Sequence, residues 1–368
     1  MRKAVIILPT YNEAGAIEQV INGIHEAVQE NKNWEIHIIV VDSNSQDGTQ
    51  EIVLRLIKKF PRLQLLQTKR EGLGRAYIQG FQTAFEKINP YLIFEMDADL
   101  SHDPNKILEF LKKIEEGADF VIGSRYIKGG SIPKDWGIHR KIFSVGANLV
   151  IRFGFMKLRV TDWTSGFRAI KSWIIKKATP HVKNYSGYVF QVAILDFAIK
   201  NKAHINEIPI QFRDRVHGES KINSIQYIVQ TFLYVFLNSS FIKFALVGLI
   251  GFVIDFGISY IFIENLKSAV WVGTFISSET AIVSNFFLNN FWSFAHKKLD
   301  HKLSAYLPNF IKFNVVSSGS ILIQTIGVQL ASNFFGRKLW YLYKVILIVF
   351  IIIPYSYVLY NKFIWKEK

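Results

Sequence analysis

Two aspartates separated by a single residue are candidates for binding a divalent cation. Asp97 and Asp99 follow the apolar run 91–96 and precede a polar loop. Mg²⁺ and Mn²⁺ prefer hard oxygen ligands, keep several waters, and are commonly shared between one or two carboxylates and the phosphates of a substrate. Pairs of this kind are common in solvated turns that bind nothing, so the place of the pair in the fold decides the prediction.

Two other polar segments also follow apolar runs. Residues 9–13 (PTYNE) come after one run and residues 42–49 (DSNSQDGT) after another. In an open, mostly parallel sheet, ligands bind beyond the carboxyl ends of the strands. We therefore expect these segments to meet the aspartate pair at one edge. Asp42 is suited to hydrogen bonding with a base or a ribose, whereas Asp47 before a glycine predicts a turn.

The elements that position these residues follow from the hydrophobic pattern of the first 220 residues. Strand-like and helix-like stretches alternate, which predicts an α/β domain with a mostly parallel sheet covered by helices. Strands are predicted at residues 4–8, 36–41, 63–67, 91–96 and 120–124. Helices are predicted at residues 14–30, 50–60, 73–88 and 104–116. The last helix has Asp103 as its N-cap and Pro104 in its first turn.

The composition argues against an ordinary soluble enzyme. Of 368 residues, 50% are hydrophobic, and 44 Lys and Arg against 29 Asp and Glu give a net charge of +15. So apolar a chain is not disordered, and the absence of Cys excludes disulfides and thiolate sites. The positive charge is distributed and no groove-reading motif is present, so nucleic acid is not an expected partner. The first apolar run ends at Pro9, too early for a signal peptide.

Four long apolar segments occupy the last third of the chain. Each approaches the roughly 20 residues that a helix needs to cross a bilayer. They are residues 241–263, 269–291, 310–335 and 339–360. Basic residues gather between the second and third segments and after the fourth, so the positive-inside rule predicts a membrane protein whose catalytic domain and both termini are cytoplasmic.

The apolar third also contains an internal repeat. The tetrapeptide FIKF occurs at residues 241–244 and again at 310–313, each time opening a hairpin of two spans, which predicts a parallel repeat. Residues 138–155 and 224–237 mix apolar and basic or polar side chains at helical spacing. They predict amphipathic helices on the membrane surface, with buried core helices as the alternative. The predicted domains are residues 1–222 (catalytic), 223–240 (interfacial linker) and 241–368 (membrane).

A set of motifs resembles the dolichyl-phosphate (polyprenyl-phosphate) mannose synthases of the family 2 glycosyltransferases. The set covers nearly all of the first 225 residues, and its TSGFR form is closer to mannose synthases than to the related glucose enzymes. The motifs are LPTYNE at 8–13, VDSNSQDGT at 41–49, GLGRA at 72–76, MDADLSH at 96–102, GSRY at 123–126, DWTSGFRA at 162–169 and RVHGESK at 215–221. Residues 241–368 resemble the four-helix GtrA-like membrane domain.

The resemblance implies a GT-A fold and inverting transfer of mannose from GDP-mannose to dolichyl or polyprenyl phosphate, with Mg²⁺ or Mn²⁺. Carried over by position, the nucleotide contacts are Pro9, Tyr11, Glu13, Val41 and Asp42. The metal and diphosphate contacts are Asp97, Ala98 and Asp99, with Ser101 where the family often has Gln. The donor diphosphate contacts are Arg215 and Lys221, and the acceptor phosphate contacts are Arg125, Arg140 and Ser144.

Elementary chemistry agrees with these roles. A nucleoside diphosphate leaving group needs a cation and basic side chains, while a phosphate monoester is already an anion near neutral pH and needs no strong base. Asp162 is expected to contact sugar hydroxyls or to order Arg168, with a structural ion pair as the alternative.

Two other functions remain open at the level of sequence. One is a polyprenyl-phosphate glucosyltransferase that uses UDP-glucose. The other is a lipid-linked sugar flippase or scaffold with a vestigial nucleotide domain, for which Asp255, Glu279 and Lys344 are intramembrane polar candidates. Processive polysaccharide synthesis is disfavoured because no QxxRW segment follows the catalytic region. The sequence does not predict an oligomeric state.

Overall fold

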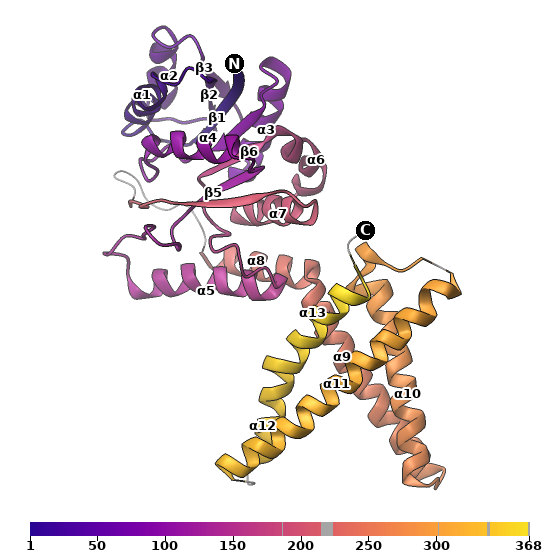
Figure 1. Ribbon diagram of the computed structural model, residues 1–368. Helices are drawn as coiled ribbons and strands as arrows, with labels where there is room; N and C mark the ends of the chain where they lie inside the picture. Colours follow the sequence, from indigo (N-terminus) through magenta and orange to yellow (C-terminus); the bar gives the residue numbers. More distant parts are fainter. Residues whose placement is uncertain (186, 215–223, 301, 337–338, 367–368) are drawn as a thin grey trace. The chain divides into compact units, whose positions relative to one another are not determined.

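The computed structural model describes residues 1–185, 187–214, 224–300, 302–336 and 339–366 (Figure 1). The chain forms two compact units. The first comprises Met1–Phe153 and Lys157–Tyr234, and the second comprises Gly154–Met156 and Val235–Lys368. The two units are described separately below. The predicted three-part boundaries stay predictions.

A seven-stranded sheet is the centre of the first unit, with strand order β3-β2-β1-β4-β6-β5-β7. Its strands are β1 (Arg2–Thr10), β2 (Trp34–Asp42), β3 (Leu63–Gln67), β4 (Leu92–Glu95), β5 (Phe120–Ser124), β6 (Arg168–Lys171) and β7 (Ile205–Pro209). Only β6 is antiparallel, pairing with β4 and β5. All five predicted strands are present and the α/β class is confirmed, whereas β6 and β7 were not predicted.

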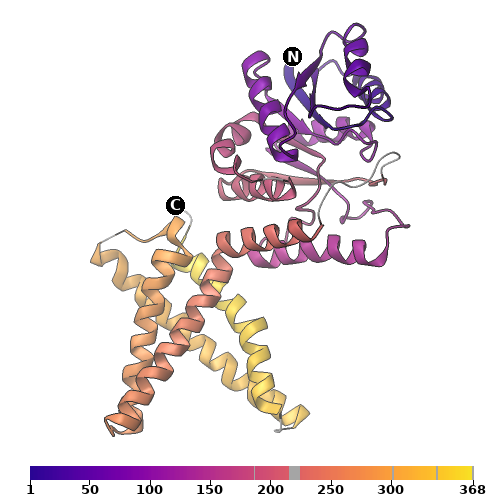
Figure 2. The same ribbon diagram turned by 180° about the vertical axis from the view of Figure 1, so that it is seen from behind.

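Helices cover both faces of this sheet (Figures 1 and 2). One face carries α1 (Ile17–Val28), α2 (Thr49–Ile57) and α4 (Ile107–Glu115), and the other carries α3 (Leu73–Lys87), α6 (Ser172–Val182) and α7 (Gly187–Lys200). Asp103 caps the turn before α4, as predicted, by accepting a hydrogen bond from the amide of Asn105. Gly80 lets α3 approach the sheet, since a Cβ there would lie 2.8 Å from Ile7.

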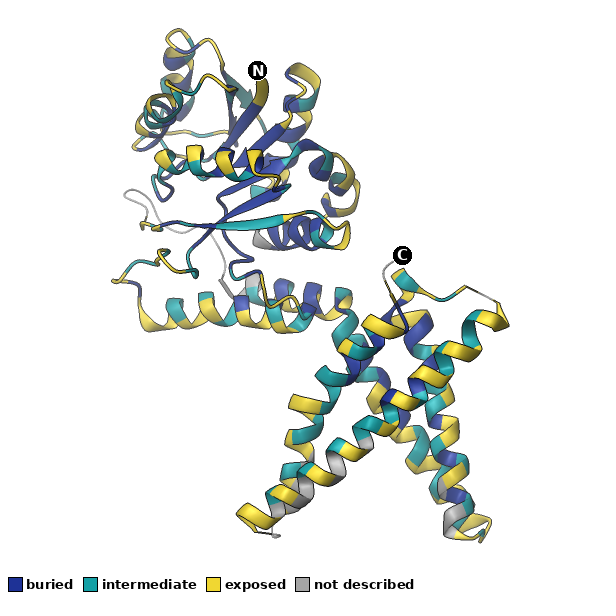
Figure 3. Cartoon of the chain, viewed as in Figure 1, coloured by how far each residue is buried: buried dark blue, intermediate teal, exposed yellow. Residues whose placement is uncertain are grey.

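Two further helices, α5 (Ile138–Phe155) and α8 (Ser224–Asn238), match the stretches predicted to be amphipathic. Figure 3 shows exposed residues along these helices, and many of them are large and apolar. On α5 these are Ile138, Ile142, Phe143, Val145, Leu149, Val150 and Phe153, and on α8 they are Val229, Phe232, Leu233, Phe236 and Leu237. Exposed apolar patches of this size mark surfaces that contact a membrane or another protein.

The second unit is helical, and its helices coincide with the four predicted spans. They are α9 (Ser240–Tyr260), α10 (Val270–Leu288), α11 (Leu303–Phe335), α12 (Trp340–Leu347) and α13 (Ile353–Phe363). Among the residues that the structure describes, two stretches are long and apolar enough to cross a membrane, Ser240–Asn265 and Val345–Phe363.

In each copy of the internal repeat, a polar side chain of the second helix packs against the corresponding position of the first helix. In the first copy Gly251 lies against Asn285, whose side chain would be 2.2 Å from a Cβ at position 251. In the second copy Ser320, which occupies the place of Gly251, pairs with Ser356 at 2.9 Å between hydroxyls.

Asp255, a predicted intramembrane polar residue, accepts hydrogen bonds from Ser277 and Ser278.

A buried hydrophobic cluster of the second unit lies at one end of the helices (Figure 3). Aromatic rings dominate this cluster, which includes Phe244, Phe286, Phe294, Phe313, Tyr360 and Trp365. Asn290 is fully buried beside it. Its Oδ1 accepts hydrogen bonds from the Trp365 indole at 3.0 Å and from the Leu299 amide at 2.8 Å. One side chain thereby joins the end of α10, the following loop and the segment after α13.

We expect Asn290→Ala to destabilise this unit, because it leaves the Trp365 and Leu299 donors without an acceptor. Each lost partner of a buried donor costs about 1–3 kcal/mol, so the melting temperature in detergent should fall by about 5 °C or more. Asn309→Ala is the matched control, since the Asn309 amide donates a local hydrogen bond to the Ala305 carbonyl within the same helix. Equal shifts in the two variants would contradict the role assigned to Asn290. Thermal unfolding followed by circular dichroism measures both.

Candidate functional site

The carboxyl ends of β1 and β2 meet at one edge of the sheet. The strands are parallel, with Thr10 directly opposite Asp42. Thr10 Oγ1 donates to Asp42 Oδ2 at 2.8 Å, and the amide of Asn12 donates to Ser45 Oγ at 2.8 Å. The predicted meeting of segments 9–13 and 42–49 is therefore observed.

Asp42 organises this edge. Its carboxylate is fully buried and accepts hydrogen bonds from Thr10, from the amide and hydroxyl of Ser45, and from Gln50 Nε2 at 2.6 Å. Both oxygens are therefore occupied by protein donors. The side chain fixes the two loops relative to each other, and its predicted contact with a nucleotide stays a prediction.

The other predicted nucleotide contacts lie on the same two strand ends. Pro9 is the register partner of the buried Val41, and the amide of Glu13 donates to Thr49 at 2.9 Å. Tyr11 is covered by Arg70, whose guanidinium carbon lies 3.9 Å from the ring centroid and whose Nη1 donates to the Tyr11 hydroxyl. Arg70 was missed, although a basic residue just after the third strand was visible in the sequence.

The turn predicted at Asp47 and Gly48 is present. Gly48 has φ of 94°, a conformation that favours glycine. Asp47 accepts hydrogen bonds from the amide and hydroxyl of Thr49 and from the amide of Ala14. Burial alone would raise the pKa of Asp47, but these hydrogen bonds outweigh it and hold the pKa below its usual range.

Asp97 and Asp99 follow β4, which lies beside β1. The Asp97 side chain is 35% exposed, and Asp99 and Ala98 are buried. Leu100 has φ of 67°, so the chain turns sharply after Asp99. Asp99 Oδ1 accepts the amide of Ser101 at 3.1 Å.

Ser101 supplies the observation that tests a metal here. Its hydroxyl is buried and forms no hydrogen bond within the part of the chain that the structure describes. Two carboxylates and a hydroxyl within five residues supply hard-oxygen donors of the kind that fits Mg²⁺ or Mn²⁺. No group of three His, Cys, Asp or Glu suited to a metal occurs among the described residues. The remaining ligands would come from water and substrate phosphates.

His102 supports the Asp97 turn and was not assigned a role from the sequence. Its Nδ1 accepts the amide of Asp97 at 3.1 Å, and its Nε2 lies 3.9 Å from Asp97 Oδ2. The ring is buried and stacks on Phe167 at 4.9 Å between centroids. Burial lowers the pKa of His102 to about 4. The imidazole is therefore neutral at physiological pH, in agreement with an Nδ1 that accepts.

Arg125 forms a bidentate pair with the buried Asp162. Nε donates to Oδ2 and Nη2 donates to Oδ1, both at 2.7 Å. Burial alone would raise the pKa of Asp162, but the Arg125 charge and the hydrogen bonds hold it below its usual range. Asp162 therefore forms a structural ion pair, the alternative that the sequence left open, and the partner that the structure records is Arg125. Glu207 on β7 supports the same loop by accepting from Thr161 and from the Asp162 amide.

The remaining acceptor-site candidates lie on or near α5. Ser144 Oγ is 2.6 Å from the hydroxyl of Tyr126, the residue after Arg125. Arg140 stacks on Trp136 at 3.9 Å and pairs with Asp214 at 3.1 Å, with 41% of its side chain exposed. The two predicted donor-phosphate contacts, Arg215 and Lys221, lie outside the described residues.

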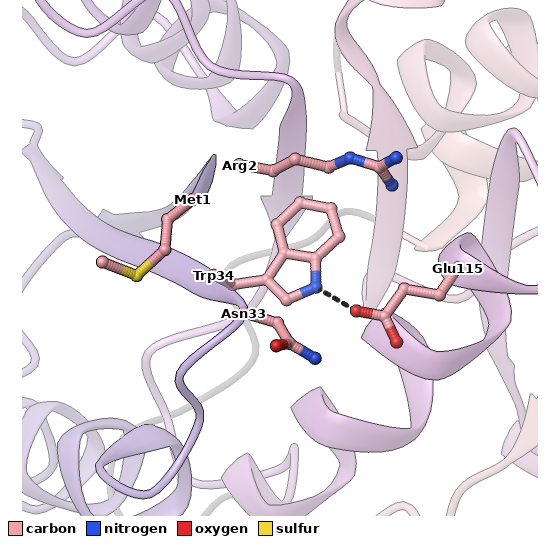
Figure 4. Close-up of a pocket in the computed structure, with 5 residues that line it drawn as sticks. All are labelled: Met1, Arg2, Asn33, Trp34 and Glu115. Carbon is pink, nitrogen blue, oxygen red and sulfur yellow. Dashed lines mark hydrogen bonds between the residues drawn. The ribbon is translucent and has the colours of Figure 1, made fainter.

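A separate hollow lies at the opposite edge of the sheet (Figure 4). It is lined by Met1, Arg2, Asn33, Trp34 and Glu115, and the Trp34 indole donates to Glu115 at 2.7 Å. Since β1 begins at Arg2 and β2 at Trp34, this hollow lies at the amino ends of the strands. It is therefore remote from the aspartate pair.

Comparison with known proteins places both parts of the chain. The Glycosyl transferase family 2 model matches residues 5–179, and the GtrA/DPMS transmembrane domain model matches residues 243–365. A dolichol-phosphate mannosyltransferase of Pyrococcus furiosus is 32% identical over 87% of this chain and 88% of its own length. A polyprenol monophosphomannose synthase of Mycolicibacterium smegmatis is 34% identical over 60% of this chain and 82% of its own length.

Among solved structures, a glucosyl-3-phosphoglycerate synthase from Mycobacterium tuberculosis, in complex with Mn²⁺, UDP and phosphoglyceric acid, matches 64% of this chain and 78% of its own. Its sequence identity is 17% and its TM-score is 0.48.

We expect Glu95→Gln to change how stability depends on pH. Burial raises the pKa of Glu95 to about 7, from 4.5 in the unfolded chain. Between these values only the folded protein binds the proton, so unfolding free energy falls as pH rises. His102, with a folded pKa of about 4 against 6.5 unfolded, contributes the opposite slope. The two nearly cancel in the native protein. Only the His102 slope remains in the variant. Its unfolding free energy should therefore rise by about 3 kcal/mol between pH 4.5 and 6.5, while that of the native protein stays nearly constant.

Denaturant unfolding in detergent at several pH values measures this change. The control is Glu86→Gln, which replaces an exposed glutamate on α3 and should keep the native profile. If Glu95→Gln and the native protein showed the same dependence of stability on pH, a raised pKa of Glu95 would be contradicted.

Proposed function

We propose a complete reaction for this chain, which belongs to the dolichol-phosphate mannosyltransferases of glycosyl transferase family 2 and carries a GtrA/DPMS transmembrane domain. It is a membrane glycosyltransferase of the GT-A type that makes polyprenol-phosphate mannose. In our proposal GDP-mannose is the donor and dolichyl or polyprenyl phosphate is the acceptor. The mannose is transferred with inversion, with the help of Mg²⁺ or Mn²⁺.

The observation that carries the proposal is that Asp97, Asp99 and Ser101 follow β4 at the edge where β1 and β2 also end, and that the Ser101 hydroxyl forms no hydrogen bond with any residue that the structure describes. A divalent cation held by these oxygens and the donor diphosphate would offset the negative charge that develops on the GDP leaving group. The strand ends beside it supply Tyr11 and Asp42 to define the nucleotide side. Arg215 and Lys221 complete the diphosphate contacts in this proposal.

The acceptor side needs orientation more than base catalysis. A phosphate monoester carries about −1.5 to −2 charges at neutral pH, so its oxygen is already a nucleophile. Asp162 holds the guanidinium of Arg125 in a constant orientation. Arg140 would exchange its exposed partner Asp214 for the acceptor phosphate, and Ser144 would donate its hydroxyl. Holding the phosphate in line with the sugar carbon is the catalytic contribution of these residues.

The membrane placement follows from the isoprenoid acceptor. We propose that all four helical segments of the second unit span the bilayer and that the catalytic unit is cytoplasmic, as the distribution of basic residues favours. The apolar rows on α5 and α8 would lie in the interfacial region, where amphipathic helices bind lipid. The phosphate of a lipid-embedded acceptor would then be presented at the membrane surface.

We expect Asp99→Ala to reduce transfer of radiolabelled mannose from GDP-mannose to dolichyl phosphate by about 100- to 1000-fold, the usual loss when a main electrostatic stabiliser of the transition state is removed. Asp103→Ala is the control, because Asp103 caps a turn two residues after Ser101 and should keep activity within about twofold. Undiminished activity in Asp99→Ala would contradict the role of Asp99 as a ligand of the divalent cation. Preferred use of UDP-glucose in a donor competition would favour the glucosyltransferase alternative.

We expect Arg140→Ala to raise the KM for the polyprenyl phosphate by about 10-fold or more, since a charge-assisted hydrogen bond contributes about 1.5–3 kcal/mol. The KM for GDP-mannose should stay unchanged. Lys141→Ala, a neighbouring charge whose amine donates to the Lys134 carbonyl, is the matched control. Initial rates at varied acceptor and donor concentrations separate the two constants. A rise in the donor KM alone would contradict the acceptor role.

A further inference from the structure

A buried ion pair lies at the end of β4, two residues before Asp97. Glu95 is the last residue of β4 and Arg168 the first of β6, and they are register partners across the antiparallel ladder. Both side chains are 0% exposed, and Arg168 Nη1 lies 3.9 Å from Glu95 Oε2. Neither Glu95 oxygen accepts a hydrogen bond within the described part of the chain. The chain continues from Glu95 through Met96 to Asp97.

Arg168 connects three segments around this point. Its Nη1 donates to the carbonyl of Gln191 at 2.7 Å, and its Nη2 donates to the carbonyl of Trp163 at 2.8 Å. One guanidinium therefore contacts the end of β4, the loop before β6 and the first turns of α7. Shifting any of these segments changes the position of the others.

The Gln191 side chain reaches the same point as the Asp97 carboxylate. A Cβ added to Gly166 would lie 3.2 Å from Asp97 Oδ2 and 3.3 Å from Gln191 Nε2, so the two groups converge where residue 166 has no side chain. Gln191 is 1% exposed, and neither atom of its amide is hydrogen-bonded among the described residues. A buried amide donor thus stands beside a carboxylate predicted to bind the cation.

Stability does not explain these groups. An ion pair removed from water at 3.9 Å gains less from attraction than it loses in solvation, and apolar residues of similar volume are often as stable or more so. An amide with no partner costs about 1–3 kcal/mol. Their position next to Asp97 points to a functional role instead. Groups that contact a metal ligand fix the orientation of that ligand and raise the affinity of the site for the metal.

We propose that Glu95, Arg168 and Gln191 are positioning residues for Asp97. A small rotation lets Gln191 Nε2 donate a charge-assisted hydrogen bond to Asp97 Oδ2, and the Glu95–Arg168 pair fixes the distance between β4 and α7 on which that bond depends. The inference rests on the proposed function in one respect, that Asp97 binds the divalent cation.

Gln191→Leu tests the amide at nearly constant volume. Mn²⁺ binding to the full chain in detergent with GDP, measured by electron paramagnetic resonance of free Mn²⁺, should weaken by about 10-fold or more. The melting temperature should stay the same or rise, because no hydrogen bond is lost. Gln79→Leu is the matched control, since the Gln79 amide oxygen is also buried and has no hydrogen-bond partner among the described residues, but lies on α3. Native Mn²⁺ affinity in Gln191→Leu would overturn the role of Gln191.

The double variant Glu95→Leu, Arg168→Met tests the ion pair. Its melting temperature should fall, because the carbonyls of Gln191 and Trp163 lose their donor. Its folded fraction should bind Mn²⁺ about 10-fold more weakly and show a KM for GDP-mannose that rises more than kcat falls. Lys171→Met is the control, because Lys171 pairs with Asp119 at the other end of β6. A destabilised double variant whose folded fraction binds Mn²⁺ normally would show a structural pair and overturn the inference.

The two proposals fail in different ways. Native protein that binds Mn²⁺ but transfers no mannose would refute the proposed reaction and leave the positioning role to be decided by the variants. Native protein that binds no Mn²⁺ in the presence of GDP would refute both. Native protein that binds and transfers, with variants that do the same equally well, would refute only the positioning role.

Discussion

The parallel alignment of β1, β2 and β4 is the constraint on which the rest of the structure depends. Because these strands run the same way side by side, the residues that follow each of them leave the sheet at one edge. The apolar interior of the strands fixes their register, with Thr10 opposite Asp42 and Ile7 opposite Glu95. Burial of ordinary aliphatic side chains thus brings together segments far apart in the sequence, to which our proposal assigns the nucleotide and the cation.

The buried charged groups at this edge are each held by hydrogen bonds or by an opposite charge. Asp42 is surrounded by uncharged donors, Asp162 is paired with Arg125, and Glu95 faces Arg168. Such groups are expensive to desolvate and cannot relax easily. Their rigidity keeps the polar atoms in place before a substrate arrives, which is the arrangement that electrostatic catalysis requires. The acceptor candidate Arg140, by contrast, is exposed and free to change partner.

The sequence predicted those features that depend on local pattern. Strands such as residues 4–8 are continuous apolar runs, and the turn at Asp47 and Gly48 depends on neighbouring residues. Strands β6 and β7 escaped prediction because they are short and carry Arg168 and Glu207, whose burial depends on partners far along the chain. The same holds within the site: family resemblance identified Arg125, but its pairing with Asp162 arises only when β5 and β6 come together.

The strand β6 has a further consequence because it runs opposite to its neighbours. The chain leaves β5 at Ser124 and re-enters the sheet at Arg168, at the same edge. The Arg125–Asp162 pair closes the base of this excursion. The segment between is therefore a long insertion whose two ends are held together. Its far end also contacts the turn after β4, because Gly166 lies beside Asp97 and Phe167 stacks on His102. Under the proposed function, a change in this insertion that alters acceptor binding would also reach the residues assigned to the cation, so the two specificities are coupled.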